Sequence, residues 1–227
     1  MIEDLPIWIE ILFVFTTLFT VWLYWLANLQ SGKLLVWILI LSILHAVAAY
    51  LGFYSDFDVM PPRFLLVLLP SVVAIAYGLS PKVRRRVLEN RDLQLSPFVH
   101  TIRIPVEIVL LFLFYNGTIP VLMTFEGRNL DILAGITAPI MGSLYLHGKV
   151  SSKIMLVWNI ICLGLVSFIL TNGILSAPLP FQQFGFDQPN IAVAYFPFVL
   201  LPAIIVPLVI YTHLIDIMLL VNKMKEA

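Results

Sequence analysis

Hydrophobic residues are grouped along the chain into seven long runs, separated by short polar segments. A helix needs about 20 predominantly apolar residues to cross the hydrocarbon core of a bilayer, and each run is near or above that length. We expect α-helices, because a helix satisfies its backbone hydrogen bonds within one segment, and the alternating pattern of barrel strands is absent. The predicted spans are residues 7–29, 34–54, 64–80, 98–125, 131–148, 154–176 and 197–221.

The composition agrees with a chain that lies in a membrane. Of the 227 residues, 61% are hydrophobic and 11% are charged, and the mean hydropathy is +1.01. Soluble domains carry about 25% charged residues. The 13 Lys and Arg residues balance the 13 Asp and Glu residues, so no net charge favours nucleic acid as a partner. The sequence therefore predicts an all-α integral membrane protein in which residues 1–227 form a single seven-helix domain.

The distribution of charge predicts the orientation. With the N-terminus outside, the cytoplasmic segments contain most of the basic residues: Lys33, Lys82, Arg84, Arg85, Arg86, Arg91, Lys149, Lys153, Lys223 and Lys225. The outer segments then hold two basic residues, Arg63 and Arg128, together with the acidic residues Glu3, Asp4, Asp56, Asp58, Glu126, Asp131 and Asp187. This arrangement satisfies the positive-inside rule at every loop. We expect an outside N-terminus and a cytoplasmic C-terminus in a bacterial cytoplasmic (inner) membrane.

Short similarities between the two ends of the chain suggest an internal repeat. Leu-Val-Trp at residues 35–37 recurs at residues 156–158, and Val-Leu-Leu-Pro at residues 67–70 recurs at residues 199–202. Four spans separate the copies, so both halves would have the same orientation. The pattern predicts a 3+1+3 bundle of parallel repeats, an arrangement that occurs among transporters. Chance is the alternative, because Leu and Val are so common in this chain.

The fourth and seventh predicted spans each place more than one ionisable residue on a single helical face, and such residues are costly inside a bilayer and are functional candidates for that reason. His100, Arg103 and Glu107 in the fourth span lie at spacings that put them on one helical face, and Asn116 follows farther along. His213 and Asp216 share a face of the seventh span. One interpretation is a structural ion pair between Arg103 and Glu107. The other is a proton or substrate site in which Glu107 titrates, Arg103 tunes it, and His213 and Asp216 relay protons.

The histidines also permit a metal site. His100, His147 and His213 would all lie toward the cytoplasmic side of the predicted bundle. Imidazoles combined with a carboxylate suit zinc or non-haem iron. The spacing matches no metal-binding motif, so we expect no cofactor, with zinc or iron as the alternative.

A polar hairpin connects the fourth and fifth spans. Glu126, Arg128 and Asp131 in this segment could form an outer gate in which charged partners exchange. The simpler interpretation is a tight helix hairpin, in which Gly127 permits a positive φ and Asn129 or Asp131 caps the next helix.

These features favour a transporter of a small solute, proton-coupled through the buried carboxylates and histidines. A second hypothesis is a membrane-embedded metal-dependent enzyme acting on a lipid or isoprenoid. A third is a structural subunit of a membrane complex, which needs none of these sites. The chain has no Walker A sequence, Gly-rich dinucleotide loop or G-x-S-x-G motif, so ATP-driven and serine-hydrolase functions lack support. The expected partners are the lipid bilayer, an unidentified small molecule, and a second copy or another membrane subunit.

Overall fold

The computed structural model describes residues 2–29, 31–57 and 59–226, so Asp58 lies outside the described residues. Within these ranges every regular element is helical. The longer helices are α1 (Ile7–Ala27), α2 (Gly32–Tyr50), α3 (Leu65–Gly78), α4 (Pro81–Glu89), α5 (Arg103–Tyr115), α6 (Asp131–Leu146), α7 (Ser152–Leu175) and α8 (Val206–Glu226). The 3₁₀ segments are η1 (Ser96–Ile102), η2 (Val121–Met123) and η3 (Ala192–Ala194), and η4 (Leu201–Ile205) is a π-helical turn.

Five helical stretches are long and apolar enough to cross a membrane. They are α1, α2, the continuous stretch of η1 and α5, α7, and the continuous stretch of η4 and α8. Helices α3 and α4 pass the same criterion together as a sixth stretch, although they are bent by 78° relative to each other. Helix α6 is apolar but has only 16 residues. The chain is therefore compatible with a multi-pass helical membrane protein, and the predicted count of seven crossings is not established by helix length.

The fourth predicted span is too long in the sequence analysis. Its helix ends at Tyr115, ten residues before the predicted end at 125, because Gly117 adopts φ +80°. The amide of Gly117 donates to the carbonyl of Phe114, and the amide of Thr118 donates to that of Leu113. This pattern is a Schellman motif, which caps the last carbonyls of a helix and turns the chain away. Gly52 and Gly148 end α2 and α6 in the same way.

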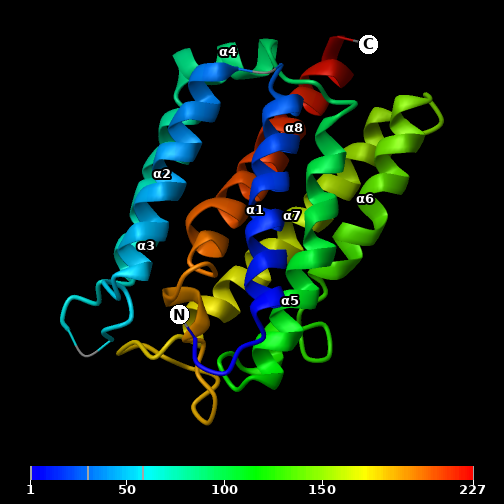
Figure 1. Ribbon diagram of the computed structural model, residues 1–227. Coiled ribbons are helices and arrows are strands. Elements are labelled where there is room, and N and C mark those ends of the chain that lie inside the picture. Colours follow the sequence, from blue (N-terminus) through cyan, green and yellow to red (C-terminus); the bar gives the residue numbers. More distant parts are fainter. Residues whose placement is uncertain (1, 30, 58, 227) are drawn as a thin grey trace.

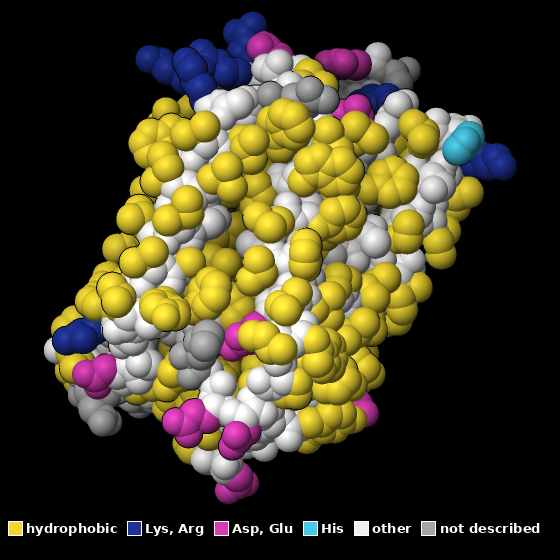
Figure 2. All heavy atoms as spheres, in the orientation of Figure 1, with side chains coloured by type: hydrophobic (Ala, Val, Ile, Leu, Met, Phe, Trp, Pro, Cys, Tyr) yellow, Lys and Arg dark blue, Asp and Glu magenta, His cyan; other side chains and the backbone are white. Residues whose placement is uncertain are grey.

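The helices form one elongated bundle whose two ends differ in charge. In Figure 1, α4 and the C-terminus lie at one end, and the N-terminus and the segments after α2 and α7 lie at the other. Figure 2 shows hydrophobic side chains over the middle of the visible face and a group of Lys and Arg side chains at the α4 end. Eight of the 19 residues of α2 are exposed large hydrophobic residues, and three are buried. A protein with so much apolar surface requires a hydrocarbon environment.

Helix α8 is the central element of the bundle. It packs most extensively against α7, and η4, which precedes it, contacts α1, α2 and α3. Ser71 in α3 donates a hydrogen bond of 2.5 Å to the carbonyl of Ala203 in η4, where the π-helical turn interrupts the regular pattern. Among the described residues, α2 and α3 show no comparable packing, although they are the counterparts of α7 and α8 in the predicted repeat.

Candidate functional site

A buried arginine connects three helices at the centre of the bundle. Arg103, at the start of α5, has an exposed fraction of 2%. Its Nη1 lies 2.6 Å from Oδ1 of Asp131 at the start of α6, and its Nη2 lies 2.9 Å from Nε2 of His213 in α8. His213 Nδ1 lies 2.7 Å from Oδ1 of Asn159 in α7. We call these four residues the Arg103 network.

The hydrogen bonds of this network select one form of His213. An arginine is only a donor, so Nε2 of His213 must accept the bond from Arg103. The amide nitrogen of Asn159 donates to the carbonyl of Met155, which leaves its Oδ1 as the acceptor of the proton on Nδ1. His213 is therefore the neutral tautomer with its proton on Nδ1. Any proton relay through His213 requires this bond pattern to rearrange first.

Arg103 does not pair with Glu107 as one sequence interpretation suggested. The ion pair of Arg103 is with Asp131, and Glu107 Oε1 accepts a bond of 2.5 Å from the amide of Asn129. Asn129 also accepts a hydrogen bond from the backbone amide of Asp131, so one side chain contacts both the Glu107 carboxylate and the backbone of Asp131. Within the described chain, Glu107 Oε2 has no hydrogen-bond partner, although Glu107 is only 2% exposed.

His100 lies beside this network, and its ring has no hydrogen bond in the described chain. Its ring stacks on His213 with a centroid distance of 3.8 Å and an interplanar angle of 5°. Trp158 meets both rings edge to face. Both ring nitrogens of His100 are buried and lack a partner among the described residues. The fourth-span and seventh-span histidines are thus brought together by the fold, in contact through their faces.

A second buried ion pair lies closer to α4. Asp216 Oδ1 accepts a bond of 2.9 Å from Nε of Arg91, and Asp216 Oδ2 accepts a bond from the hydroxyl of Ser96. Nη2 of Arg91 also donates to Ser96 Oγ at 2.5 Å, and the guanidinium lies over the ring of Tyr24. We call Arg91, Ser96 and Asp216 the Arg91 cluster. It connects the segment after α4 to α8, so Asp216 and His213 belong to two different sets of contacts.

The structure does not assemble the predicted three-histidine site. His147 is exposed at the end of α6, and its Nδ1 contacts the carbonyl of Ser143. His100 and His213 are stacked in parallel, a geometry that does not direct two nitrogens toward one ion. No group of three or more His, Cys, Asp or Glu side chains suited to a metal ion occurs among the described residues.

The predicted outer gate residues are separated by the fold. Glu126 is exposed and accepts a hydrogen bond of 3.0 Å from the hydroxyl of Tyr115, while Arg128 lies over the ring of Phe184. Asp131, the third member, is buried in the Arg103 network.

Gly127 and Asn116, which the sequence also singled out, have structural roles. Gly127 has no positive φ; it is required because a Cβ there would overlap with the carbonyl oxygen of Val121. Asn116 is the half-buried cap residue at the end of α5.

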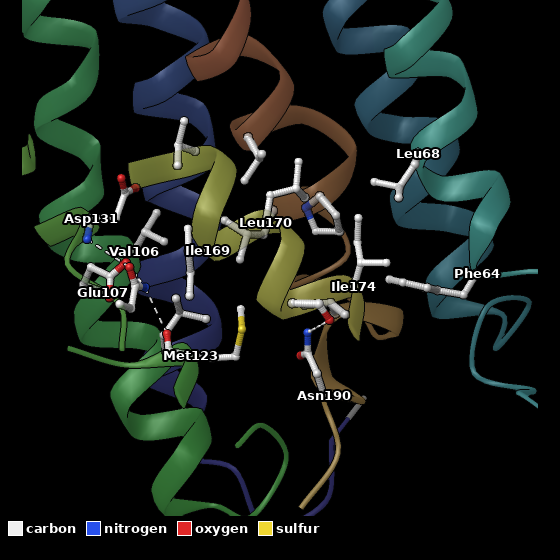
Figure 3. Close-up of a pocket in the computed structure, with 18 residues that line it drawn as sticks. Phe64, Leu68, Val106, Glu107, Met123, Asp131, Ile169, Leu170, Ile174 and Asn190 are labelled. Carbon is white, nitrogen blue, oxygen red and sulfur yellow. Dashed lines mark hydrogen bonds between the residues drawn. The ribbon is translucent and has the colours of Figure 1, made fainter. Parts of the chain in front are cut away.

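A pocket opens beside Glu107. Its cavity volume is about 70 Å³, within a larger empty space of about 610 Å³ that includes the open exterior. Figure 3 shows Glu107 and Asp131 at one side of the pocket and Asn190 apart from them, with aliphatic side chains between. The polar lining residues are Glu107, Asn129, Asp131 and Asn190, and the remaining lining comes largely from apolar side chains of α3, α5, α7, η4 and α8. The site therefore combines a hydrocarbon wall with a buried acidic end.

Sequence reasoning missed the residues that organise this site. Asn159 and Asn190 were not candidates, and Arg91 was assigned only to orientation. A polar amide inside a predicted span was an available signal for Asn159, because such groups need hydrogen-bond partners in a membrane. Asn190 lies in the long segment between α7 and η4, where nothing in the pattern indicates its contact with the pocket.

The comparisons with known proteins identify a family. No curated protein and no solved structure is significantly similar to this chain. A family model matches residues 60–221, which include α3 through most of α8 and therefore the pocket, the Arg103 network and the Arg91 cluster. Helices α1 and α2 precede the matched region. The chain belongs to the family described as Domain of unknown function (DUF8737).

Proposed function

We propose that the protein is a multi-pass membrane transporter of a small solute, with the pocket as the solute site and Glu107 as its proton-coupling group. One observation carries this proposal: the buried Oε2 of Glu107 lacks a partner in the described chain and belongs to a pocket-lining side chain. A carboxyl group in this position can hold either a proton or a solute, which is the requirement for coupling the two. Ionisable groups that line cavities inside membranes commonly serve such pathways.

The orientation and the number of crossings belong to the same proposal. We infer seven crossings, with the short α6 and the bent pair of α3 and α4 included, and a bacterial cytoplasmic membrane with the N-terminus outside. The basic residues at the α4 end support a cytoplasmic position for that end. The 3+1+3 repeat and assembly with a second copy or another subunit remain predictions from the sequence.

A membrane enzyme acting on a lipid or isoprenoid is the second candidate function. The observation that favours it is the aliphatic lining of the pocket, which suits a hydrocarbon substrate. Glu107 would then act as an acid on the bound substrate instead of as a carrier of protons across the membrane. Incubation with such a substrate would yield a new product, whereas a transporter returns the solute unchanged.

The experiment for transport uses purified full-length protein in liposomes that contain a pH-sensitive dye. Small amines, alcohols and carboxylates are added outside in turn, and proton movement is recorded. We expect at least one solute to move protons in the wild type but not in Glu107→Gln. Glu89→Gln is the matched control, because Glu89 is an exposed carboxylate on α4 that pairs with Arg85 on the same helix. Equal fluxes in Glu107→Gln and the wild type, or no flux with any solute, would overturn the proposal.

A further inference from the structure

The unsatisfied polar atoms of pocket-lining residues are hydrogen-bond acceptors. Glu107 Oε2 and Asn190 Oδ1 are buried and have no partner in the described chain. The donors beside them are already engaged: the amide of Asn129 donates to Glu107 and Met123, and the amide of Asn190 donates to Gly173. A ligand that satisfies this pocket must therefore supply donors.

Acidic side chains outnumber basic side chains around the pocket. Glu107 and Asp131 are the charged residues of the lining, and no Lys, Arg or His side chain lines the pocket. Arg103 pairs with Asp131 and attracts Glu107 one helical turn away. One guanidinium thus faces two carboxylates, and burying the extra negative charge is costly unless a positive charge accompanies it. A proton on Glu107 supplies that charge in one state, and a cationic ligand would supply it in another.

The rest of the lining determines the body of the ligand. Phe64, which precedes α3, and Leu68 of α3 lie across the pocket from the carboxylates, and Ile169, Leu170 and Ile174 of α7 lie between (Figure 3). These side chains offer dispersion contacts and no hydrogen bonds, so they suit a hydrocarbon group.

We infer that the pocket binds a lipophilic amine, whose protonated amino group contacts Glu107 and whose hydrocarbon body lies along the aliphatic lining. The inference rests on the proposed function and assigns its substrate class. Binding exchanges one positive charge for another: the O–H bond of protonated Glu107 breaks, its proton leaves for solvent, and the ammonium pairs with the carboxylate. The released proton forms a new bond to water or to a buffer base, and no other covalent bond forms or breaks. Asn190 Oδ1 is available for a second donor on the ligand.

The test is isothermal titration calorimetry on the detergent-purified full chain with three matched probes: 4-phenylbutylamine, 4-phenylbutanol and 4-phenylbutyrate. We expect the amine to bind about tenfold more tightly than the alcohol, because hydrogen bonds to charged groups are roughly twice as strong as neutral ones. The carboxylate should not bind. Repeating the amine titration in two buffers with different ionisation enthalpies should reveal the release of a proton.

Two variants separate the acidic end from the hydrocarbon wall. Glu107→Gln keeps an oxygen that can accept from Asn129, so the fold is preserved, and it should bind the amine and the alcohol about equally well. Leu170→Trp fills the pocket from a half-buried position and should weaken both probes in parallel. Glu89→Gln should bind as the wild type does.

The outcomes distinguish this inference from the transport proposal. Wild-type binding of the amine that does not exceed that of the alcohol, a preference for the amine that persists in Glu107→Gln, or no amine binding at all would overturn the amine assignment. A neutral solute that moves protons in a Glu107-dependent way would overturn this assignment and leave the transport proposal intact. Selective amine binding without any flux in liposomes would support the site and overturn transport.

Discussion

The charge balance around Arg103 makes a quantitative prediction for two substitutions. Asp131→Asn retains an oxygen that can accept from Arg103, and the second carboxylate, Glu107, can then balance the guanidinium. Glu107→Gln leaves the 2.6 Å pair between Arg103 and Asp131 in place. Each single substitution should therefore lower the free energy of unfolding by only about 1 kcal/mol, the net value of one altered hydrogen bond.

The double variant Asp131→Asn/Glu107→Gln should behave differently. It leaves Arg103, 2% exposed, without a counterion, and removing the partner of a buried charge costs about 3–5 kcal/mol. The double variant should thus lose at least about 1–2 kcal/mol more than the sum of the single effects. SDS-induced unfolding in mixed micelles, monitored by tryptophan fluorescence, measures this coupling free energy. The exposed pair Arg85–Glu89 is the control, with an expected coupling of at most about 0.5 kcal/mol. Additivity within about 0.5 kcal/mol would refute the reasoning.

Three further predictions follow from other parts of the bundle. Asp216→Leu leaves the arginine of the Arg91 cluster buried without its partner, so the free energy of unfolding should fall by about 3–5 kcal/mol. The control Glu89→Gln should change the free energy of unfolding by less than about 0.5 kcal/mol. A small loss for Asp216→Leu would contradict the cluster. Gly127→Ala should destabilise the protein by about 1–3 kcal/mol in the same assay because its Cβ meets backbone, whereas Gly164→Ala has open space around its Cβ and should be neutral or stabilising. Single cysteines are introduced near each terminus of a variant that lacks Cys162, and intact cells are treated with an impermeant maleimide. Only the cysteine near the N-terminus should react. The opposite labelling would reverse the proposed orientation.

Much of the helical layout could be predicted from local sequence. Long apolar runs can satisfy their backbone only as helices in a membrane, so the approximate position of each helix follows from the pattern. The short basic stretch after α3 also forms a helix, Pro81–Glu89. The end of α5 was missed because its stop signal is a single glycine within an apolar stretch that is long enough to suggest a continuing helix. Gly117 with Pro120 after it was a local signal for that stop.

The partners of the polar residues could not be predicted in this way. Arg103 and Glu107 share a helical face, and local spacing alone pairs them with each other. Asp131 and His213 lie 28 and 110 positions from Arg103 in sequence, and only helix packing brings them into contact. The same holds for the pocket, whose lining residues come from five α-helices and the segments that connect them. Periodicity decides which side of a helix is polar, but the order in which helices pack decides which polar groups satisfy one another and which acceptor is left for a ligand.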